Sequence, residues 1–483
     1  MNYACLWFFP AIVFLYYFSI SRSPRYCLMA ASLLIGSSLF RKYFGRGHPA
    51  LVYTALFVPI LTATGIALWQ YTHYNNPGDV DTSAFTTAFW NLAHGNLHIS
   101  LWNANLFSDH SNYLSILFVP VFIAAGNTGL IITQSLLILL TVVVLIKPLT
   151  TNDISKVFIV SAIVFSPPIF AILLYGFHGD VLGAPFLALA LWAYKENKIC
   201  AFVLLTIALA FAKEVFVLGA GGLIALALIE RRNWRWILLP LLAGSIAIAM
   251  YWYGVLPILA KSGNRVAWAM PNGIGQWLAL ILRKENAWYV FTVLFPLIPL
   301  FAVTSWKYIV LPLPFMLFYA GFPDPSFRVV FRQYSFPIAI MCWGTLLLGE
   351  NEKLKRLSPV LFLTVALAYP SWKPLVNPTH YDRARVKDIP AVTAMISHNA
   401  SLLVHAACVS QFVDRKEVNN WIYRNKPIDQ FEYALFDSRF LPQWWNDTGS
   451  VRSTIDLLRE SPAWETKYSA NGLYLFKNKM IGR

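Results

Sequence analysis

The segment DVDTSAFTTAFWNLAHG, residues 79–95, is a polar stretch in a chain that is otherwise largely apolar. An apolar run from Leu51 to Trp69 comes before it, and a second run begins near Asn112. The residues between these runs include aspartates and histidines but no Lys or Arg. Because Lys and Arg accumulate in cytoplasmic loops, this composition predicts a loop on the outer side of a membrane.

The same segment has the periodicity of a short helix. Four apolar residues recur at the spacing i, i+3, i+4, i+7, namely Phe85, Ala88, Phe89 and Leu92. Asp81 stands at the expected N-cap and Gly95 at the expected end. We therefore expect a helix that lies on the outer membrane face, with the carboxylates of Asp79 and Asp81 at its start.

The overall composition is that of a polytopic membrane protein. Of the 483 residues, 57% are hydrophobic and only 13% are charged, whereas soluble domains are about one quarter charged. Much of the net charge of +15 lies in short loops between apolar runs. There it meets membrane lipid headgroups, so it indicates no nucleic-acid partner. The five Cys residues have no paired spacing and form neither a disulfide framework nor a metal motif.

Hydropathy divides the chain into three parts. Residues 1–48 read as an N-terminal apolar hairpin and a basic cytoplasmic loop, residues 49–370 as a transmembrane domain with a large first outer loop at 70–128, and residues 371–483 as a polar tail. We expect an all-α polytopic fold of about 11–13 transmembrane helices. Eleven expected spans lie near residues 51–69, 129–146, 155–173, 181–194, 199–212, 215–229, 236–254, 288–305, 308–321, 333–348 and 357–370.

The distribution of Lys and Arg orients these spans. The expected inner loops carry about twice as many Lys and Arg residues as the expected outer loops before the tail, as the positive-inside rule requires. An odd number of spans then puts the tail outside. Short apolar pieces at 402–407 and 433–436 alternate with helical stretches in the tail. We therefore expect a small C-terminal α/β extracytoplasmic domain.

Carboxylates and imidazoles recur at three places on the expected outer side. They are Asp79 and Asp81, Asp109 and His110, and His178 and Asp180. Such groups can act as a general base, as metal ligands or as hydrogen-bond partners of a sugar. A structural reading stays open, in which Asp81 caps the helix and Asp79 occupies a Pro77-Gly78 turn.

Two further sets of charged residues interrupt apolar sequence. Lys213 and Glu214 divide an apolar stretch, and ionisable residues in such a position usually face a cavity or a partner. An ion pair between these two neighbours in a tight turn is the alternative. Arg328 and Arg332 precede the span that starts near Tyr334. A guanidinium can hold phosphate oxygens in bidentate fashion, while snorkelling to ordinary headgroups is the alternative.

The order of these motifs resembles that of a known family. The pattern Asp81-x8-Trp90-Asn91-x3-Gly95, followed by Asp109-His110 and Gln134, resembles a prokaryotic predicted-membrane-protein family of unknown function related to the GT-C glycosyltransferases. Later blocks resemble it in the same order: Phe177-His178, Lys213-Glu214, Arg332-Gln333-Tyr334, and in the tail Ala400-Ser401 and Arg415. The resemblance covers residues 50–440. In one departure, Thr86 and Thr87 stand where many relatives have acidic residues and Gln, so the choice of donor or acceptor can differ.

The resemblance implies an inverting integral-membrane glycosyltransferase of the inner membrane, with its active site on the extracytoplasmic face. The donor would be a polyprenyl-phosphate-linked sugar and the acceptor a cell-envelope glycan or lipid-linked acceptor, as in lipopolysaccharide or O-antigen modification. Asp81 would be catalytic, together with Asp79. The residues expected to bind substrate are Trp90, Asn91, Asp109, His110, His178, Asp180, Lys213, Glu214, Arg328, Arg332 and Tyr334. Asp79, Asp109 and His110 offer ligands for a divalent cation, Mg²⁺ or Mn²⁺.

The residues suit this chemistry in their own right. One carboxylate near the membrane surface can take the proton of an acceptor hydroxyl, and Lys or Arg can neutralise a departing phosphate. Two other classes stay open. A transporter or flippase for lipid-linked sugars would predict two similar halves, and we find no such symmetry. A non-enzymatic envelope assembly protein would leave Asp81 and Lys213 replaceable.

Overall fold

The computed structural model describes most of residues 49–481. Outside this description are residues 73–78, 100, 102–103, 148, 150–152, 260–272, 330–332, 350–357, 359–360, 363–364, 366–382, 406–408, 410, 416, 422–425 and 439–447. The expected N-terminal hairpin, residues 1–48, and most of the last expected span, 357–370, therefore lie outside the described residues.

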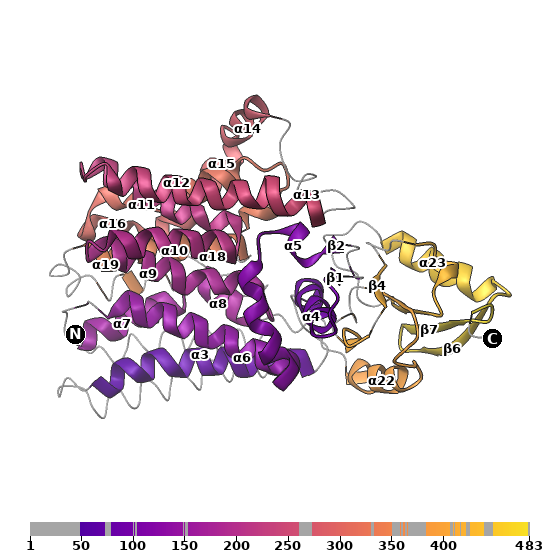
Figure 1. Cartoon of the computed structure of the whole chain (residues 1–483). Helices are drawn as coiled ribbons and strands as arrows, with labels where there is room; N and C mark the ends of the chain where they lie inside the picture. The colour runs from indigo at the N-terminus through magenta and orange to yellow at the C-terminus, as the bar shows by residue number, and fades with distance from the viewer. Residues whose placement is uncertain are drawn as a thin grey trace.

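The described residues from 49 to 349 form mainly a bundle of helices that run lengthwise beside one another (Figure 1). Its longer helices are α3 (Pro49–Thr72), α6 (Val119–Ile146), α7 (Asp153–Val164), α8 (Pro167–Leu174), α9 (Gly183–Lys195), α10 (Ile199–Ala212), α11 (Val217–Ile229) and α12 (Arg235–Ala249). Later helices are α13 (Leu256–Leu259), α14 (Ile274–Ile281), α15 (Lys284–Leu294), α16 (Ile298–Thr304), α17 (Leu313–Ala320), α18 (Phe336–Trp343) and α19 (Thr345–Leu348). Their apolar side chains form one continuous core. This confirms the expected all-α membrane domain.

Several of these helices are long and apolar enough to cross a membrane. Within the described residues there are four, namely Ala50–Thr72, Tyr113–Ile146, Arg235–Leu259 and Lys284–Ala302. The pair Ser155–Val164 and Pro167–Leu174, which is bent by 56°, is apolar enough to make a fifth if its two halves form one span. Pro167 and Pro168 lie at the bend, because Pro can begin a helix but not continue one. The remaining apolar helices are shorter, and the total of 11–13 spans stays a prediction.

The first loop is shorter than its sequence indicated. We expected the second span to begin at 129, but α6 begins at Val119 and follows a 3₁₀ turn at Tyr113–Phe118. Gly126, with φ 56°, breaks the helical geometry inside α6, a conformation that favours glycine. Before this turn the loop contains α4 (Asp79–Ala93), the two-stranded β1 (His98–Ile99) and β2 (Ala104–Asn105), and α5 (Leu106–Asp109).

The C-terminal part is a separate α/β domain at one end of the bundle (Figure 1). Its elements are α22 (Arg383–Ala394), β3 (Leu402–Val404), β4 (Val418–Asn420), β5 (Tyr433–Asp437), α23 (Thr448–Glu460), β6 (Trp464–Ala470) and β7 (Leu473–Asn478). The sheet order is β4-β3-β5-β7-β6, in which β3 pairs in parallel with β4 and β5, and β7 pairs antiparallel with β5 and β6. The strands expected at 402–407 and 433–436 are present, and the α/β class is confirmed.

Candidate active site

Helix α4 lies between the bundle and the C-terminal domain and is seen end-on in Figure 1, so its axis crosses those of the bundle helices. Phe85 and Phe89 pack on the Phe177 ring, at centroid distances of 5.8 and 5.9 Å. The Thr82 hydroxyl donates to the Phe177 carbonyl at 3.1 Å. These contacts hold the start of α4 against the segment that follows α8.

Two expectations for α4 are wrong in detail. The helix begins at Asp79, so Asp81 lies within the first turn rather than at the N-cap. The helix is also buried on more than its apolar face, because Thr82, Ser83, Thr86 and Thr87 are fully buried. Threonine and serine tolerate such enclosure since they can bond to the helix itself, as the Thr86 hydroxyl does to the Thr82 carbonyl at 2.9 Å.

Asp81 is held by residues from the turn between α8 and α9. Its Oδ2 accepts a hydrogen bond from the Tyr175 hydroxyl at 3.0 Å and lies 3.9 Å from His178 Nε2. The backbone N–H of Asp180 donates to His178 Nδ1 at 3.3 Å. Nδ1 is therefore an acceptor, and the neutral imidazole carries its proton on Nε2, which faces Asp81. Burial lowers the pKa of His178 against the opposing effect of Asp180 and Asp81, which favours this neutral form.

The turn that carries His178 is fixed by Gln134 of α6. The Gln134 amide donates to the carbonyls of Ile172 and Gly176 at 2.7 and 2.5 Å, and its oxygen accepts from the His178 N–H at 2.9 Å. Close packing also requires glycine here, because a Cβ on Gly179 would lie 2.5 Å from the Phe85 ring. The imidazole position is thus set by α4 and α6 together.

Lys213 and Asp180 form a buried ion pair. Lys213 follows α10, and its Nζ lies 2.8 Å from both carboxylate oxygens of Asp180, in the 3₁₀ turn η2 (Gly179–Leu182). Burial alone would raise the pKa of Asp180, but the Lys213 ammonium outweighs it and holds that pKa below its usual range. The expected alternative, an ion pair between Lys213 and its neighbour Glu214, is therefore wrong.

Glu214 instead binds His110. Its Oε1 lies 2.6 Å from His110 Nδ1, and its Oε2 accepts from the Ser111 N–H at 3.0 Å. The Ser111 hydroxyl reaches the Ala210 carbonyl at 2.6 Å. These contacts fix the end of the first loop to the turn between α10 and α11. Lys213 and Glu214 are adjacent in the chain, so the Asp180 and His110 pairs lie side by side.

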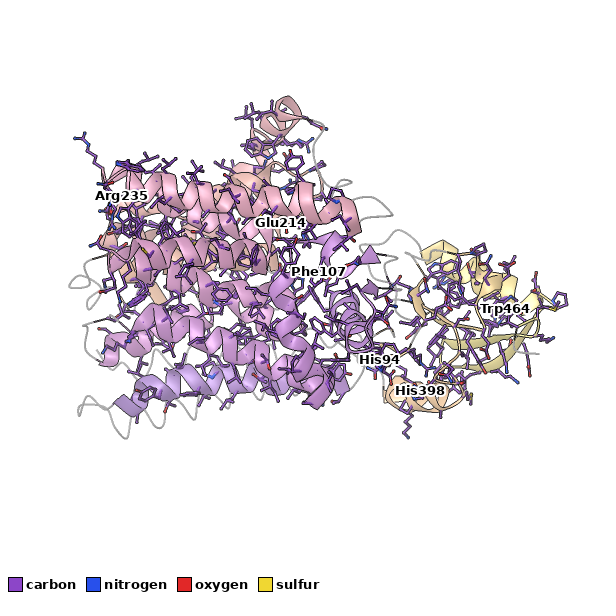
Figure 2. All side chains as sticks on the ribbon, viewed as in Figure 1. His94, Phe107, Glu214, Arg235, His398 and Trp464 are labelled. Atoms are coloured by element: carbon purple, nitrogen blue, oxygen red, sulfur yellow. The ribbon has the colours of Figure 1, made fainter. Side chains whose placement is uncertain are left out.

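The result is a chain of contacts from Asp81 through His178 and Asp180 to Lys213, which is followed in the sequence by Glu214 of the separate Glu214–His110 pair. It lies toward the end of the bundle that faces the C-terminal domain, where Figure 2 labels Glu214, and away from Arg235 at the opposite end. Sequence reasoning expected Lys213 to approach the first loop. The structure connects Lys213 with Asp81 through Asp180 and His178, and it connects the next residue in the chain, Glu214, with His110.

The other expected site residues lie in different surroundings. Trp90 stacks on the exposed His94 ring at 4.1 Å, and Asn91 is buried. Arg328 donates to the Phe322 carbonyl at 2.7 Å, and the Tyr334 ring packs on Phe327 at 4.4 Å. Arg332 and the side chains of Asp79 and Asp109 lie outside the described part of the chain.

A metal site is not formed by the side chains that the structure describes. Among them, no group of three or more His, Cys, Asp or Glu side chains is arranged to hold a metal ion. Of the three ligands expected for a divalent cation, only the side chain of His110 is described, and it is bound to Glu214. Asp79 and Asp109 remain the candidates for such a site.

Sequence reasoning missed two residues of the site. Tyr175 was not singled out, although it directly precedes the Gly176-Phe177-His178 block. Ser111 was not considered, although it follows His110 and contributes two of the contacts to Glu214. Gln134 was noted only as part of a family pattern, since no local signal shows that a buried amide in the middle of α6 supports a distant turn.

Comparisons with known proteins agree on the class. The model of the family described as Predicted membrane protein (DUF2079) matches residues 72–475. No curated protein matches the sequence. Among solved structures, the chain is similar to ArnT from Cupriavidus metallidurans bound to undecaprenyl phosphate, with a TM-score of 0.57 and 10% identity over 90% of this chain and 99% of that chain. The apo state of ArnT gives 0.54 and 9% over 86% and 97%. At this identity the likeness concerns the fold, which is GT-C-like.

Proposed function

The chain belongs to the DUF2079 family of predicted membrane proteins, and on that premise we propose that it is an inverting glycosyltransferase. It takes a sugar from a polyprenyl-phosphate-linked donor and transfers it to an envelope glycan or lipid-linked acceptor. The observation that carries this proposal is the position of Asp81. Its side chain is 27% exposed and lies beside the buried His178 and the buried Lys213–Asp180 pair, in a fold similar to one that has been solved with undecaprenyl phosphate.

Asp81 is the general base of the proposed reaction. Its contacts with Tyr175 and His178 both involve Oδ2, and we assign Oδ1 to the acceptor. The carboxylate takes the hydroxyl proton while the acceptor oxygen attacks the anomeric carbon from the face opposite the phosphate. The bond between that carbon and the phosphate oxygen breaks, and the lipid phosphate leaves with the bonding electrons. Configuration at the anomeric carbon is inverted.

Other residues of the proposed site hold Asp81 and the departing phosphate. Tyr175 orients the carboxylate, and the neutral His178 keeps a polar N–H towards it without neutralising it. The buried Lys213–Asp180 pair anchors the turn beneath them. Arg328 and Arg332 are the guanidinium groups that we assign to the phosphate, because bidentate contacts to phosphate oxygens are characteristic of Arg. Trp90 and Asn91 are assigned to the sugar.

A transfer assay tests this function. Purified protein is incubated with polyprenyl-phosphate-linked hexoses or pentoses and with envelope glycans from a strain that lacks the gene, and labelled product is measured. Asp81→Asn keeps the shape of the side chain, so the protein should fold. Its rate should fall by about a hundred- to ten-thousand-fold, as for loss of a general base. Transfer by Asp81→Asn at the wild-type rate would show that Asp81 has a structural role only.

Sidedness is a second part of the proposal. We place the first loop, within 70–128, and residues 371–483 on the outer face, because the loop lacks Lys and Arg and Arg235 lies at the far end of the bundle. In a cysteine-free background, single cysteines at the exposed Ala93 and Arg452 should react with a membrane-impermeant maleimide in spheroplasts. Cysteine at the exposed Arg231 should react only after lysis. Labelling of only one of the first two positions would contradict this topology.

A further inference from the structure

Helices α9 and α11 end in turns of the same kind. Asn197 has φ 55° and Arg231 has φ 52°, and the N–H of the next residue donates at 2.9 Å to a carbonyl in the last turn of the helix. The side chain of Arg232 joins the two turns, because its Nη1 donates to Asn197 Oδ1 at 2.8 Å. Lys198 and Arg231 therefore stand on adjacent turns of one surface.

Arg231 occupies a position that favours glycine. A left-handed residue directly after a helix is most often Gly and sometimes Asn, and Asn197 in the equivalent turn follows this rule. Arg231 instead places a long, exposed cationic side chain there. The contacts that hold the two turns together come from the side chain of Arg232. The guanidinium of Arg231 is thus available to a partner outside the chain.

Two kinds of cation meet at these turns. Arg232 and Lys307 are both bound to Glu230. Three exposed cations form no ion pair within the described part of the chain, and we call them the basic surface: Lys198, Arg231 and Arg235. One further carboxylate of these turns, Glu196, is exposed. The basic surface therefore presents an excess of positive charge at the end of the bundle away from the C-terminal domain, where Figure 2 labels Arg235.

An exposed apolar stripe begins directly at the basic surface. Within the described residues, four single helices are long and apolar enough to cross a membrane, and the one that contains α12 is the least buried. Only 22% of its apolar stretch is buried, compared with 44–56% in the others. Exposed side chains recur every four residues along one face, which we call the α12 stripe: Trp234, Leu238, Leu242 and Ile246. The Arg235 guanidinium lies 5.8 Å from the centre of the Trp234 ring, so charge and apolar surface are continuous.

We propose that the basic surface and the α12 stripe together form a binding site for an anionic phospholipid. The guanidinium groups hold the phosphate, because Arg binds phosphate oxygens in bidentate fashion. The acyl chains lie along the α12 stripe, and Trp234 stands at the boundary, where Trp is enriched in membrane proteins. Basic clusters at the ends of membrane helices attract anionic headgroups. This lipid site lies at the opposite end of the bundle from Asp81 and takes no part in the proposed reaction.

Thermal unfolding in the presence of lipid tests this site. The unfolding midpoint of the purified full-length protein is measured in neutral detergent, alone and with phosphatidylglycerol or phosphatidylcholine. A ligand that binds the folded state raises the midpoint, so phosphatidylglycerol should raise it by a few degrees and phosphatidylcholine by much less. In the double variant Arg231→Gln with Arg235→Gln, the effect of phosphatidylglycerol should fall to that of phosphatidylcholine.

A matched control separates a defined site from general attraction between charges. Lys147→Gln with Lys156→Gln removes the same charge at the turn between α6 and α7, on the same expected inner side. This control should keep the wild-type response to phosphatidylglycerol. An equal loss of response in both double variants, or a full response in the Arg231→Gln, Arg235→Gln protein, would overturn the proposal. Stabilisation by glycerol 3-phosphate as strong as by phosphatidylglycerol would also overturn it, because that molecule has no acyl chains.

A single variant keeps the test independent of folding defects. Arg231→Gly should be at least as stable as wild type without lipid, because glycine adopts φ 52° without strain. Its midpoint should nevertheless rise less with phosphatidylglycerol than that of wild type. A stable Arg231→Gly protein with the full wild-type response would show that Arg231 does not bind the phosphate.

Discussion

Two carboxylates at opposite ends of the bundle are held in different ways. Glu230 directly follows α11 and is close in sequence to Arg235, which Figure 2 labels at the end of the bundle away from the C-terminal domain. It accepts from the Tyr194 hydroxyl at 2.9 Å, from Arg232 Nε at 3.2 Å and from Lys307 Nζ at 2.7 Å. Asp81, at the other end, accepts from the Tyr175 hydroxyl and faces a neutral imidazole 3.9 Å away. Each carboxylate is partly buried, but Glu230 has two cationic partners.

Glu230 is the centre of a group of contacts that connects several elements, which we call the Glu230 joint. Arg232 also donates to the Tyr194 carbonyl at 3.0 Å and to Asn197 Oδ1 at 2.8 Å, and its guanidinium lies 3.8 Å from the centre of the Tyr194 ring. Lys307 belongs to the 3₁₀ turn η7 (Trp306–Val310). These contacts join α9, the turn between α11 and α12, and η7. Burial alone would raise the pKa of Glu230, but its bonds to Lys307 and Tyr194 lower it.

The difference distinguishes a buried carboxylate that stabilises the fold from one that can take part in a reaction. A carboxylate whose oxygens are engaged by cations is stabilised as an anion and has little affinity for a substrate proton. A carboxylate oriented by one hydroxyl, with no cation in direct contact among the described residues, retains an oxygen that can accept a proton. Substitutions at the Glu230 joint should therefore affect stability, whereas substitution of Asp81 should affect turnover.

The largest effect on stability is expected at the buried pair beneath Asp81. Lys213→Met should leave Asp180 as an uncompensated buried charge, and breaking such a pair costs about 3–5 kcal/mol. The double variant Lys213→Met with Asp180→Asn removes both charges and should recover most of that loss. Thermal unfolding in detergent measures both. If the single variant is as stable as wild type, the pair is not buried in the membrane-embedded protein, and the contrast with Asp81 fails.

A smaller effect is expected at Gln134, which supports the site without carrying charge. Gln134→Leu leaves the His178 N–H and two carbonyls without their partner, and each unsatisfied buried group costs about 1–3 kcal/mol. Because the imidazole position depends on these bonds, kcat should fall along with stability. Gln276→Leu, on the exposed helix α14, is the control. A destabilised Gln134→Leu protein with unchanged kcat would mean that the turn holds its geometry without Gln134.

The smallest effect is expected at the Glu230 joint. Glu230→Gln should cost about 1–2 kcal/mol, discounted because Lys307 is 39% exposed, and should leave turnover unchanged. The pKa of Glu230 is lowered in the folded protein, so its contribution is present above the unfolded value of 4.5 and is lost as pH falls through the folded value. Unfolding midpoints of wild type and variant should differ from pH 7 to 5 and converge at lower pH. A large loss of turnover in Glu230→Gln would contradict the inference that Glu230 has a structural role and Asp81 a catalytic one.

Much of the architecture could be predicted from local sequence. The apolar run at 51–69 predicted α3, and the spacing of Phe85, Ala88, Phe89 and Leu92 predicted α4, with its end near Gly95. The strands at 402–404 and 433–437 were expected from short apolar pieces. These signals are local because hydropathy and periodicity are properties of consecutive residues. The break at Gly126 and the bend at Pro167 could not be predicted from hydropathy, because hydropathy is averaged over a window of residues that is longer than either break.

By itself, the sequence determined the class of the protein, its polar first loop, and which residue types stand near the expected outer face. Only the tertiary structure decided which of the charged residues pair with one another. Lys213 has Glu214 beside it in the chain but binds Asp180, 33 positions away, and Glu214 binds His110, 104 positions away. The choice depends on distance and desolvation in the folded state, where each buried charge must meet an opposite or hydrogen-bonding partner. No pattern of consecutive residues contains that information, because it arises when α4, α6 and the turns around α9 and α10 come together.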